Sequence, residues 1–151
     1  MIGSIFGLVL TALLWQKGCS EFTCPNSNGY YADPVQCDLY YECRNGEPKV
    51  KLCKDGLVFN DLNPLYERCD FPFAVHCKDR TYLQPAQAST NCPRRNGIFA
   101  KAGSCKTFWQ CKDGLASKMN CQTGLSFNPK SGTCQWEYLV PDCGKEEPES
   151  S

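Results

Sequence analysis

CDLYYEC at residues 37–43 and CKTFWQC at residues 105–111 are the two stretches that decide the fold. Each places five residues between two cysteines, and in each an adjacent aromatic pair stands one residue before the second cysteine. A chain that repeats both a cysteine spacing and the residue types inside it contains an internal repeat.

The repeat extends over twelve of the thirteen cysteines. The intervals between successive cysteines are 12, 5, 9, 15 and 7 residues from Cys24 to Cys77, and 12, 5, 9, 12 and 8 residues from Cys92 to Cys143. The residues between them also match: CKDGLVFN at 53–60 corresponds to CQTGLSFN at 121–128. The sequence therefore predicts two tandem domains, at residues 21–77 (unit one) and 92–143 (unit two).

Two polar segments follow these units. KDRTYLQPAQASTN at 78–91 contains Pro85 and shows no hydrophobic period, so we expect a semi-flexible linker with a span of roughly 20 Å as a coil. GKEEPESS at 144–151 is short and acidic, which favours a disordered tail.

Residues 1–20 have the character of a secretory signal peptide. The apolar run from Ile2 to Trp15 is too short for a membrane span and fits the hydrophobic region of a signal sequence; the alternative is a buried core helix. Cleavage after Ser20 would remove Cys19 and leave an even number of cysteines. We therefore expect an extracellular protein whose thiols are paired in an oxidising compartment.

Each unit is too small to be stable through its apolar core alone. Three disulfides per unit, worth about 2–4 kcal/mol each, would make up the difference. Six cysteines allow 15 pairings, and the sequence alone leaves the choice open. Aromatic and β-branched residues between turn signals such as NGEP at 45–48 predict short strands. The expected fold class is small, disulfide-rich and β.

Charge and reactive groups exclude several function classes. The chain has 16 basic and 16 acidic residues, which argues against nucleic acid as a binding partner. It has no second apolar run that would suggest a membrane anchor. The single histidine, His76, cannot form a metal site with thiols already committed to disulfides. Asp38 and Glu42 flank the first aromatic pair, but Lys106 and Gln110 stand in their places in unit two. We therefore expect no enzyme activity, no metal and no cofactor.

Aromatic residues and amides are what the two units share. Tyr40 and Tyr41 correspond to Phe108 and Trp109, Phe59 to Phe127, and Asn60 to Asn128. Because neighbours on a strand point to opposite faces, one ring of each pair should be buried. The second ring shares a face with the nearby cysteine, so we expect Tyr41 and Trp109 inside, and Tyr40 and Phe108 more exposed. Flat rings and amides without shared charge suit a neutral polysaccharide, although each ring has packing as its alternative role.

The six-cysteine spacing, the aromatic pair, the GLxFN words and the CQW at 134–136 resemble the peritrophin-A chitin-binding domain, which is carbohydrate-binding module family 14. DGLVFNDLNPLYERCD, KDRTYLQPA and CPRRNGIFA are further similar to the obstructor family of arthropod cuticular proteins. The resemblance implies a three-stranded antiparallel sheet and a hevein-like β-hairpin in each unit. It also implies these disulfides: Cys24–Cys43, Cys37–Cys77, Cys53–Cys69, Cys92–Cys111, Cys105–Cys143 and Cys121–Cys134.

The same resemblance implies a function. It predicts a secreted, non-catalytic protein that binds chitin and organises or cross-links a chitinous extracellular matrix such as cuticle, with chitin-modifying enzymes as further partners. A secreted protease inhibitor or defence peptide is the alternative. The residues that we expect to contact chitin are Tyr40, Phe59, Asn60, Phe108, Phe127, Asn128 and Trp136. Unit one has Phe71 where unit two has Trp136.

Overall fold

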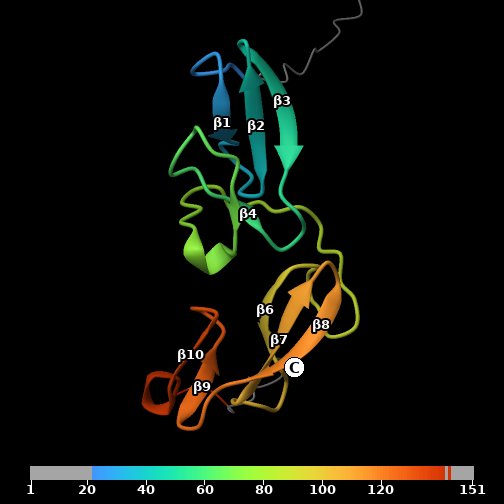
Figure 1. The fold of residues 1–151 in the computed structure, drawn as a ribbon, viewed down its shortest axis with the longest axis vertical. Helices are drawn as coiled ribbons and strands as arrows, with labels where there is room; N and C mark the ends of the chain where they lie inside the picture. The colour runs from blue at the N-terminus through green and yellow to red at the C-terminus, as the bar shows by residue number, and fades with distance from the viewer. Residues whose placement is uncertain (1–21, 142, 144–151) are drawn as a thin grey trace, which may run out of the picture.

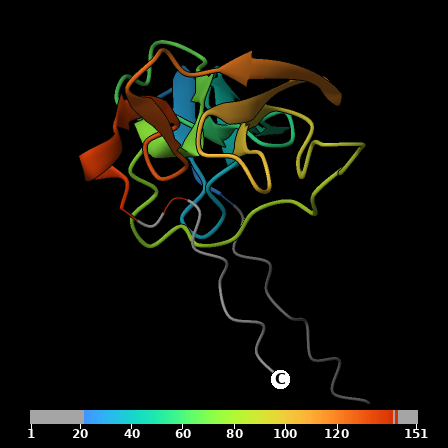
Figure 2. The same ribbon diagram turned by 90° about the horizontal axis from the view of Figure 1, so that it is seen from below.

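A computed structural model describes residues 22–141 and 143 of the chain. It places the two units one beyond the other along the long axis of the molecule (Figure 1), so that unit two lies in front of unit one when the molecule is seen from below (Figure 2). The expected signal peptide at 1–20 and the expected tail at 144–151 lie outside the described residues. Among the residues described, no helix is long and apolar enough to cross a membrane.

Each unit contains a three-stranded antiparallel sheet followed by a two-stranded hairpin. Unit one consists of β1 (Gly29–Ala32), β2 (Leu39–Arg44), β3 (Glu47–Leu52), β4 (Val58–Phe59), β5 (Cys69–Asp70) and the 3₁₀ turn η1 (Pro72–Ala74). Unit two consists of β6 (Gly97–Ala100), β7 (Thr107–Lys112), β8 (Leu115–Asn120), β9 (Leu125–Asn128), β10 (Thr133–Trp136) and η2 (Glu137–Leu139). The predicted small β fold is confirmed.

The local sequence explains the main hairpin of each sheet. Asn45 and Gly46 connect β2 to β3 with φ values of 51° and 83°, and Asp113 and Gly114 connect β7 to β8 with 50° and 86°. Two successive residues with positive φ make the tight turn whose twist matches antiparallel strands. Asn-Gly and Asp-Gly are the residue pairs that adopt it most readily, so the register of both sheets follows from these dipeptides.

Three disulfides lie within each unit. They join the pairs that the family resemblance implies: Cys24–Cys43, Cys37–Cys77, Cys53–Cys69, Cys92–Cys111, Cys105–Cys143 and Cys121–Cys134. The disulfides Cys37–Cys77 and Cys105–Cys143 each join the loop between the first two strands of a sheet to the last cysteine of the unit. They therefore link the sheet to the segment that follows the hairpin.

The core of each unit is an aromatic stack between sheet and hairpin. Tyr40 of β2 stacks on Phe59 of β4 with ring centroids 4.4 Å apart, and Phe108 stacks on Phe127 at 4.6 Å. Tyr40 is 4% exposed, whereas Tyr41 is only partly buried. The expected alternation is present, but in unit one our assignment of its faces was wrong; in unit two Phe108 and Trp109 are both partly buried. In both units the hairpin ring packs on the face of the first ring of the pair, whereas in unit one Phe22 of the segment before β1 stacks on Tyr41 on the opposite face.

Residues 78–84, the first half of the segment that we expected to be a semi-flexible linker, are packed against unit one. Tyr82 pairs with Gln36 in a parallel bridge, and the amide of Cys37 donates to the Tyr82 carbonyl at 2.9 Å. Arg80 and Gln84 are buried, at 7% and 8% exposed. The polar composition of this segment reflects polar contacts with the unit that it follows, which a search for apolar periodicity does not detect.

Candidate functional site

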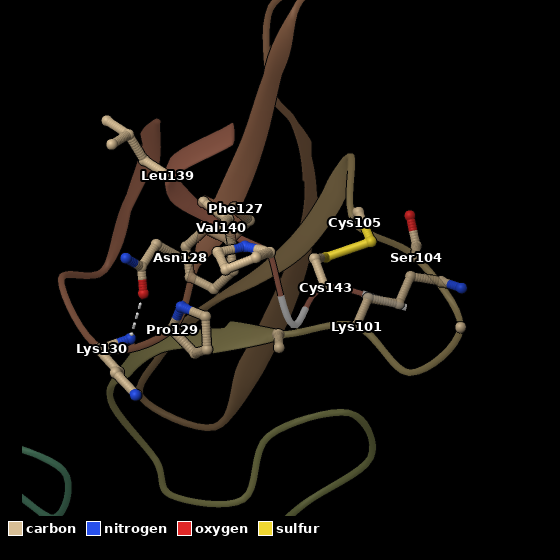
Figure 3. Close-up of a pocket in the computed structure, with 13 residues that line it drawn as sticks. Lys101, Ser104, Cys105, Phe127, Asn128, Pro129, Lys130, Leu139, Val140 and Cys143 are labelled. Carbon is tan, nitrogen blue, oxygen red and sulfur yellow. Dashed lines mark hydrogen bonds between the residues drawn. A yellow bond between two sulfur atoms is a disulfide. The ribbon is translucent and has the colours of Figure 1, made fainter. Parts of the chain in front are cut away.

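An open groove of about 650 Å³ lies in unit two beside its terminal hairpin. Figure 3 shows its walls: the loop before β7 on one side, the end of β9 and its turn on another, and the chain that leads to the Cys105–Cys143 disulfide. Phe127 and Asn128, both predicted contact residues, line it, together with Ser104. Lys101 and Lys130 also line the groove and give it a basic edge.

The corresponding place in unit one is filled. Matching the cysteines, the chain before Cys105 corresponds to the chain before Cys37, and Phe127 corresponds to Phe59. In unit one the amide of Tyr82 donates to the Val35 carbonyl at 3.2 Å, and the Arg80 guanidinium donates to the Phe59 carbonyl at 3.4 Å. Residues 78–84 thus occupy in unit one the position that is open among the described residues of unit two.

Asn60 and Asn128 shape the turns of the two hairpins. The Asn128 Oδ1 accepts the Lys130 amide at 2.9 Å, and the Asn60 Oδ1 accepts the Leu62 amide at 3.1 Å. These are turns in which a side-chain oxygen caps a backbone N–H two residues on. The side-chain Nδ2 of Asn128 donates to the Gln135 Oε1 at 2.9 Å. Asn60 is buried, whereas Asn128 is partly exposed at the groove wall, so only Asn128 is accessible to a ligand.

The most exposed rings of unit two follow the last strand of this hairpin. Trp136 ends β10 and is 56% exposed, and Tyr138 in η2 is 76% exposed. In unit one their counterparts Phe71 and Phe73 stack on each other with centroids 5.4 Å apart. Sequence reasoning missed Tyr138. The signal for it was the aromatic residue two positions after Trp136, which recurs as Phe73 two positions after Phe71.

The predicted contact residues therefore separate into two groups. Tyr40, Phe59 and Phe127 are 4%, 0% and 2% exposed, and each contributes its ring to the core. Phe108 is partly buried against Phe127. Trp136 alone among the predicted rings presents most of its surface to solvent. The structure gives a packing role to the rings that the two units share most closely.

A second aromatic surface lies on the other face of each sheet. Tyr31 pairs directly across the strands with Tyr41, and Phe99 pairs with Trp109. In unit one Phe22 stacks on Tyr41, with ring centroids 3.8 Å apart and planes within 2°. Unit two has threonine at the position of Phe22, two residues before its first cysteine. The rings of both pairs, Tyr31 with Tyr41 and Phe99 with Trp109, are partly buried.

The electrostatics of unit one are those of a structural network. The Glu67 carboxylate accepts the Tyr40 hydroxyl at 2.5 Å and pairs with Lys51 at 2.9 Å. These hydrogen bonds lower the pKa of Glu67, while burial and the bond to Glu67 raise the pKa of Tyr40. Both groups thus keep one protonation state near neutral pH. Within the described part of the chain, no three His, Cys, Asp or Glu side chains are grouped so as to hold a metal ion.

Comparison with known proteins finds a matching domain family and several similar proteins. The family described as chitin binding Peritrophin-A domain matches residues 24–77 and 92–143. Protein obstructor-E of Drosophila melanogaster is 36% identical over 144 residues, which cover 94% of this chain and 58% of that protein. Peritrophin-1 of Anopheles gambiae is 28% identical over 118 residues, which cover 72% of this chain and 75% of that protein. The chain thus spans little more than half the length of obstructor-E.

Proposed function

The chain belongs to the family of chitin-binding Peritrophin-A domains, and from that premise we propose that it is a secreted, non-catalytic protein that binds chitin through two linked domains. The repeated scaffold carries opposite net charges in its two units, −3 from Cys24 to Cys77 and +4 from Cys92 to Cys143. What recurs between them is aromatic and uncharged. A ligand that both units bind is therefore neutral, as chitin is.

The observation that carries this proposal is the open groove of unit two on the hairpin that also bears Trp136. A pyranose ring packs its C–H face on a flat, electron-rich ring such as an exposed indole. Amide and hydroxyl groups at the groove wall, from Asn128 and Ser104, offer hydrogen bonds to hydroxyl or acetamido groups. Unit two has both features, and we propose it as the principal chitin site.

Unit one would contribute a weaker site. Residues 78–84 fill its equivalent groove, and Phe71 stands in place of Trp136. Linking a weak site to a stronger one still raises the apparent affinity for a polymer, because the second binding event becomes intramolecular; the gain can reach roughly 10²–10⁴. A chain with two such sites would organise or cross-link chitin in an extracellular matrix such as cuticle. Its surface would also be available to recruit chitin-modifying enzymes.

Replacing Trp136 by alanine tests the site directly. We expect binding to insoluble chitin to fall about tenfold or more, since stacking on one exposed ring contributes on the order of 1–2 kcal/mol. Leu115→Ala is the matched control, because Leu115 is 76% exposed on β8, away from the hairpin. Loss of binding in both variants, or in neither, would contradict the assignment of the site to the hairpin.

A further inference from the structure

We propose that Asp55 is a positioning residue that fixes the two units in one relative orientation, and that this orientation makes the protein prefer ordered chitin to soluble chitin oligosaccharides. The second half of this inference rests on the proposed function. The first half concerns the fold alone and can be tested without any ligand.

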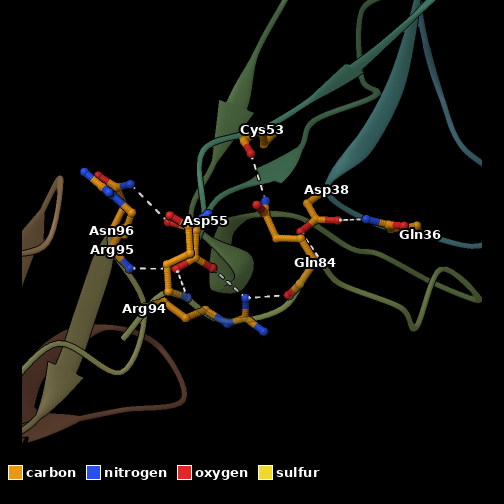
Figure 4. Close-up of polar contacts among 9 residues, drawn as sticks. Gln36, Asp38, Cys53, Asp55, Gln84, Arg94, Arg95 and Asn96 are labelled. Atoms are coloured by element: carbon orange, nitrogen blue, oxygen red, sulfur yellow. Dashed lines mark hydrogen bonds and ion pairs between the residues drawn. The ribbon is translucent and has the colours of Figure 1, made fainter. Parts of the chain in front are cut away.

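The Asp55 side chain is fully buried and every contact that it makes leaves unit one. Its Oδ2 accepts the backbone amides of Gln87 and Arg95, each at 2.9 Å, and its Oδ1 accepts the Arg94 guanidinium at 2.7 Å. Figure 4 shows these bonds converging on one carboxylate from the linker and from the start of unit two. One side chain of unit one thus binds both of the segments that follow it.

The backbone around Asp55 adds a close approach. The amide and the side-chain Nδ2 of Asn96 both donate to the Asp55 carbonyl, each at 3.0 Å. Gly56 follows with a φ of +95°, and a Cβ at this position would lie 1.8 Å from the Asn96 carbonyl oxygen. Only glycine allows unit two to approach so closely here.

Gln84 of the linker contacts both unit one and unit two at this junction. The Gln84 amide donates to the Asp38 Oδ2 at 2.8 Å, and its side chain donates to the Cys53 carbonyl at 2.8 Å. The Gln84 carbonyl in turn accepts the Arg94 guanidinium at 3.1 Å. Arg94 therefore bridges Asp55 and the linker, so that unit one, linker and unit two meet at one polar cluster (Figure 4).

The repeat shows that this cluster is not part of the domain scaffold. Unit two has Thr123 at the position of Asp55, and Thr123 is exposed. A buried carboxylate is costly unless hydrogen bonds and a countercharge compensate for its lost hydration. At Asp55 the compensation comes entirely from beyond unit one. The aspartate is therefore explained by docking of the units and not by folding of either one.

A fixed orientation changes what a two-site protein selects. If residues 85–91 formed a free coil, unit two could sample positions within roughly 15 Å, and many of these would not match a fibril. Docking removes that freedom, so that both sites meet an ordered surface without further loss of entropy. A short oligosaccharide engages one site only and gains nothing from the orientation. The junction should therefore raise the affinity for ordered chitin relative to the affinity for soluble oligosaccharides.

The test compares Asp55→Asn with wild type in the full secreted chain. Asparagine keeps the shape of the side chain but replaces one carboxylate oxygen with an NH₂ group, which cannot accept the hydrogen bonds that Arg94, Arg95 and Gln87 donate. We therefore expect the units to separate. Small-angle scattering should show a larger radius of gyration for Asp55→Asn. Affinity for crystalline chitin should fall about tenfold, whereas affinity for soluble chitin oligosaccharides should stay within twofold.

A glycine pair supplies the control for local strain. Gly56→Ala and Gly124→Ala place the same Cβ at φ values of +95° and +85°, but a Cβ at Gly124 would lie no closer than 3.6 Å to its nearest neighbour, the Trp136 ring. Only Gly56→Ala should enlarge the radius of gyration. Equal effects of the two substitutions would assign the change to backbone strain and overturn the docking role.

Two further results would overturn the inference. A scattering profile of Asp55→Asn that matches wild type would show that the carboxylate does not hold the units. An enlarged profile with an unchanged ratio of fibril to oligosaccharide affinity would show that orientation does not determine preference. If wild type binds neither form of chitin, the proposed function fails, while the scattering comparison still decides whether Asp55 docks the units.

Discussion

Replacing Tyr40 by alanine should destabilise unit one by about 3–5 kcal/mol, the usual cost of truncating a buried aromatic side chain. The Tyr40 ring is 4% exposed and stacks on Phe59, which is fully buried. Alanine would leave one face of Phe59 without a packing partner, in a unit too small to collapse around the cavity. The substitution also removes the hydroxyl that donates to Glu67 at 2.5 Å.

Tyr40→Phe separates the ring from the hydroxyl. Unit two already has this arrangement, with Phe108 stacked on Phe127 and no hydroxyl at that position. We expect a loss of only about 1 kcal/mol, because the Glu67 side chain is 40% exposed and regains water when the hydrogen bond is lost. Most of the effect of alanine should therefore come from the ring.

Guanidinium unfolding without reductant provides the assay. Beyond residue 21 the tryptophans are Trp109 and Trp136, both in unit two, so tryptophan emission reports on that unit. Far-ultraviolet circular dichroism reports on both units. Tyr40→Ala should lower the midpoint of the dichroism transition and leave the emission transition in place.

Tyr41→Ala is the comparison that can refute the packing argument. Tyr41 is partly buried under Phe22 and should cost less than Tyr40 when it is truncated. If Tyr41→Ala destabilises unit one more than Tyr40→Ala does, the hairpin does not pack on the face that the structure indicates.

Three other outcomes follow from the same structure. Burial raises the pKa of Asp55, but the amides of Arg95 and Gln87 and the Arg94 guanidinium outweigh it and hold the pKa below its ordinary value. The docking that it stabilises should therefore persist above about pH 4 and be lost as the pH falls through that lowered pKa, which scattering from pH 7 to pH 2 would show. Binding to insoluble chitin should change little between 50 mM and 1 M salt, since stacking and neutral hydrogen bonds are weakly screened; a collapse of binding would implicate the lysines of unit two instead. The secreted protein should begin at Glu21 and take up no alkylating reagent before reduction, as intact mass would show, whereas one alkylated thiol would contradict complete pairing.

The sequence predicts the sheets and hairpins because their determinants are local. The turn residues Asn45–Gly46 and Asp113–Gly114 set the hairpins, and the first three cysteine intervals are identical, so the two sheets can be matched residue by residue. Family resemblance then supplied the disulfide pairs, which spacing alone left open among 15 choices per unit.

The faces of the strands were predicted wrongly because they depend on packing between distant segments. Alternation correctly places Tyr40 and Tyr41 on opposite faces, but it does not say which face the hairpin covers. That choice is made by the hairpin ring 19 residues further along the chain, which is Phe59 in unit one and Phe127 in unit two. A cysteine two residues away indicates a shared face, and it does not indicate which face is more deeply buried.

The junction escaped prediction for a different reason. Its residues differ between the two copies, whereas reasoning from a repeat concentrates on what the copies share. The trace in the sequence is CKDG at 53–56 against CQTG at 121–124, where Lys54 and Asp55 stand in place of glutamine and threonine. The groove of unit two was not predicted, although two of the residues that line it, Phe127 and Asn128, are predicted contact residues; its closure in unit one depends on how residues 78–84 pack.

A pull-down of the intact chain on chitin beads beside cellulose beads tests the central claim most directly. The two polymers share their backbone geometry and differ in the acetamido group, so they separate recognition of chitin from general adhesion to a polysaccharide. The account predicts that chitin retains the protein, that cellulose does not, and that Trp136→Ala reduces retention on chitin. Equal retention on both polymers, or recovery of the wild-type protein in the unbound fraction of both, would contradict it.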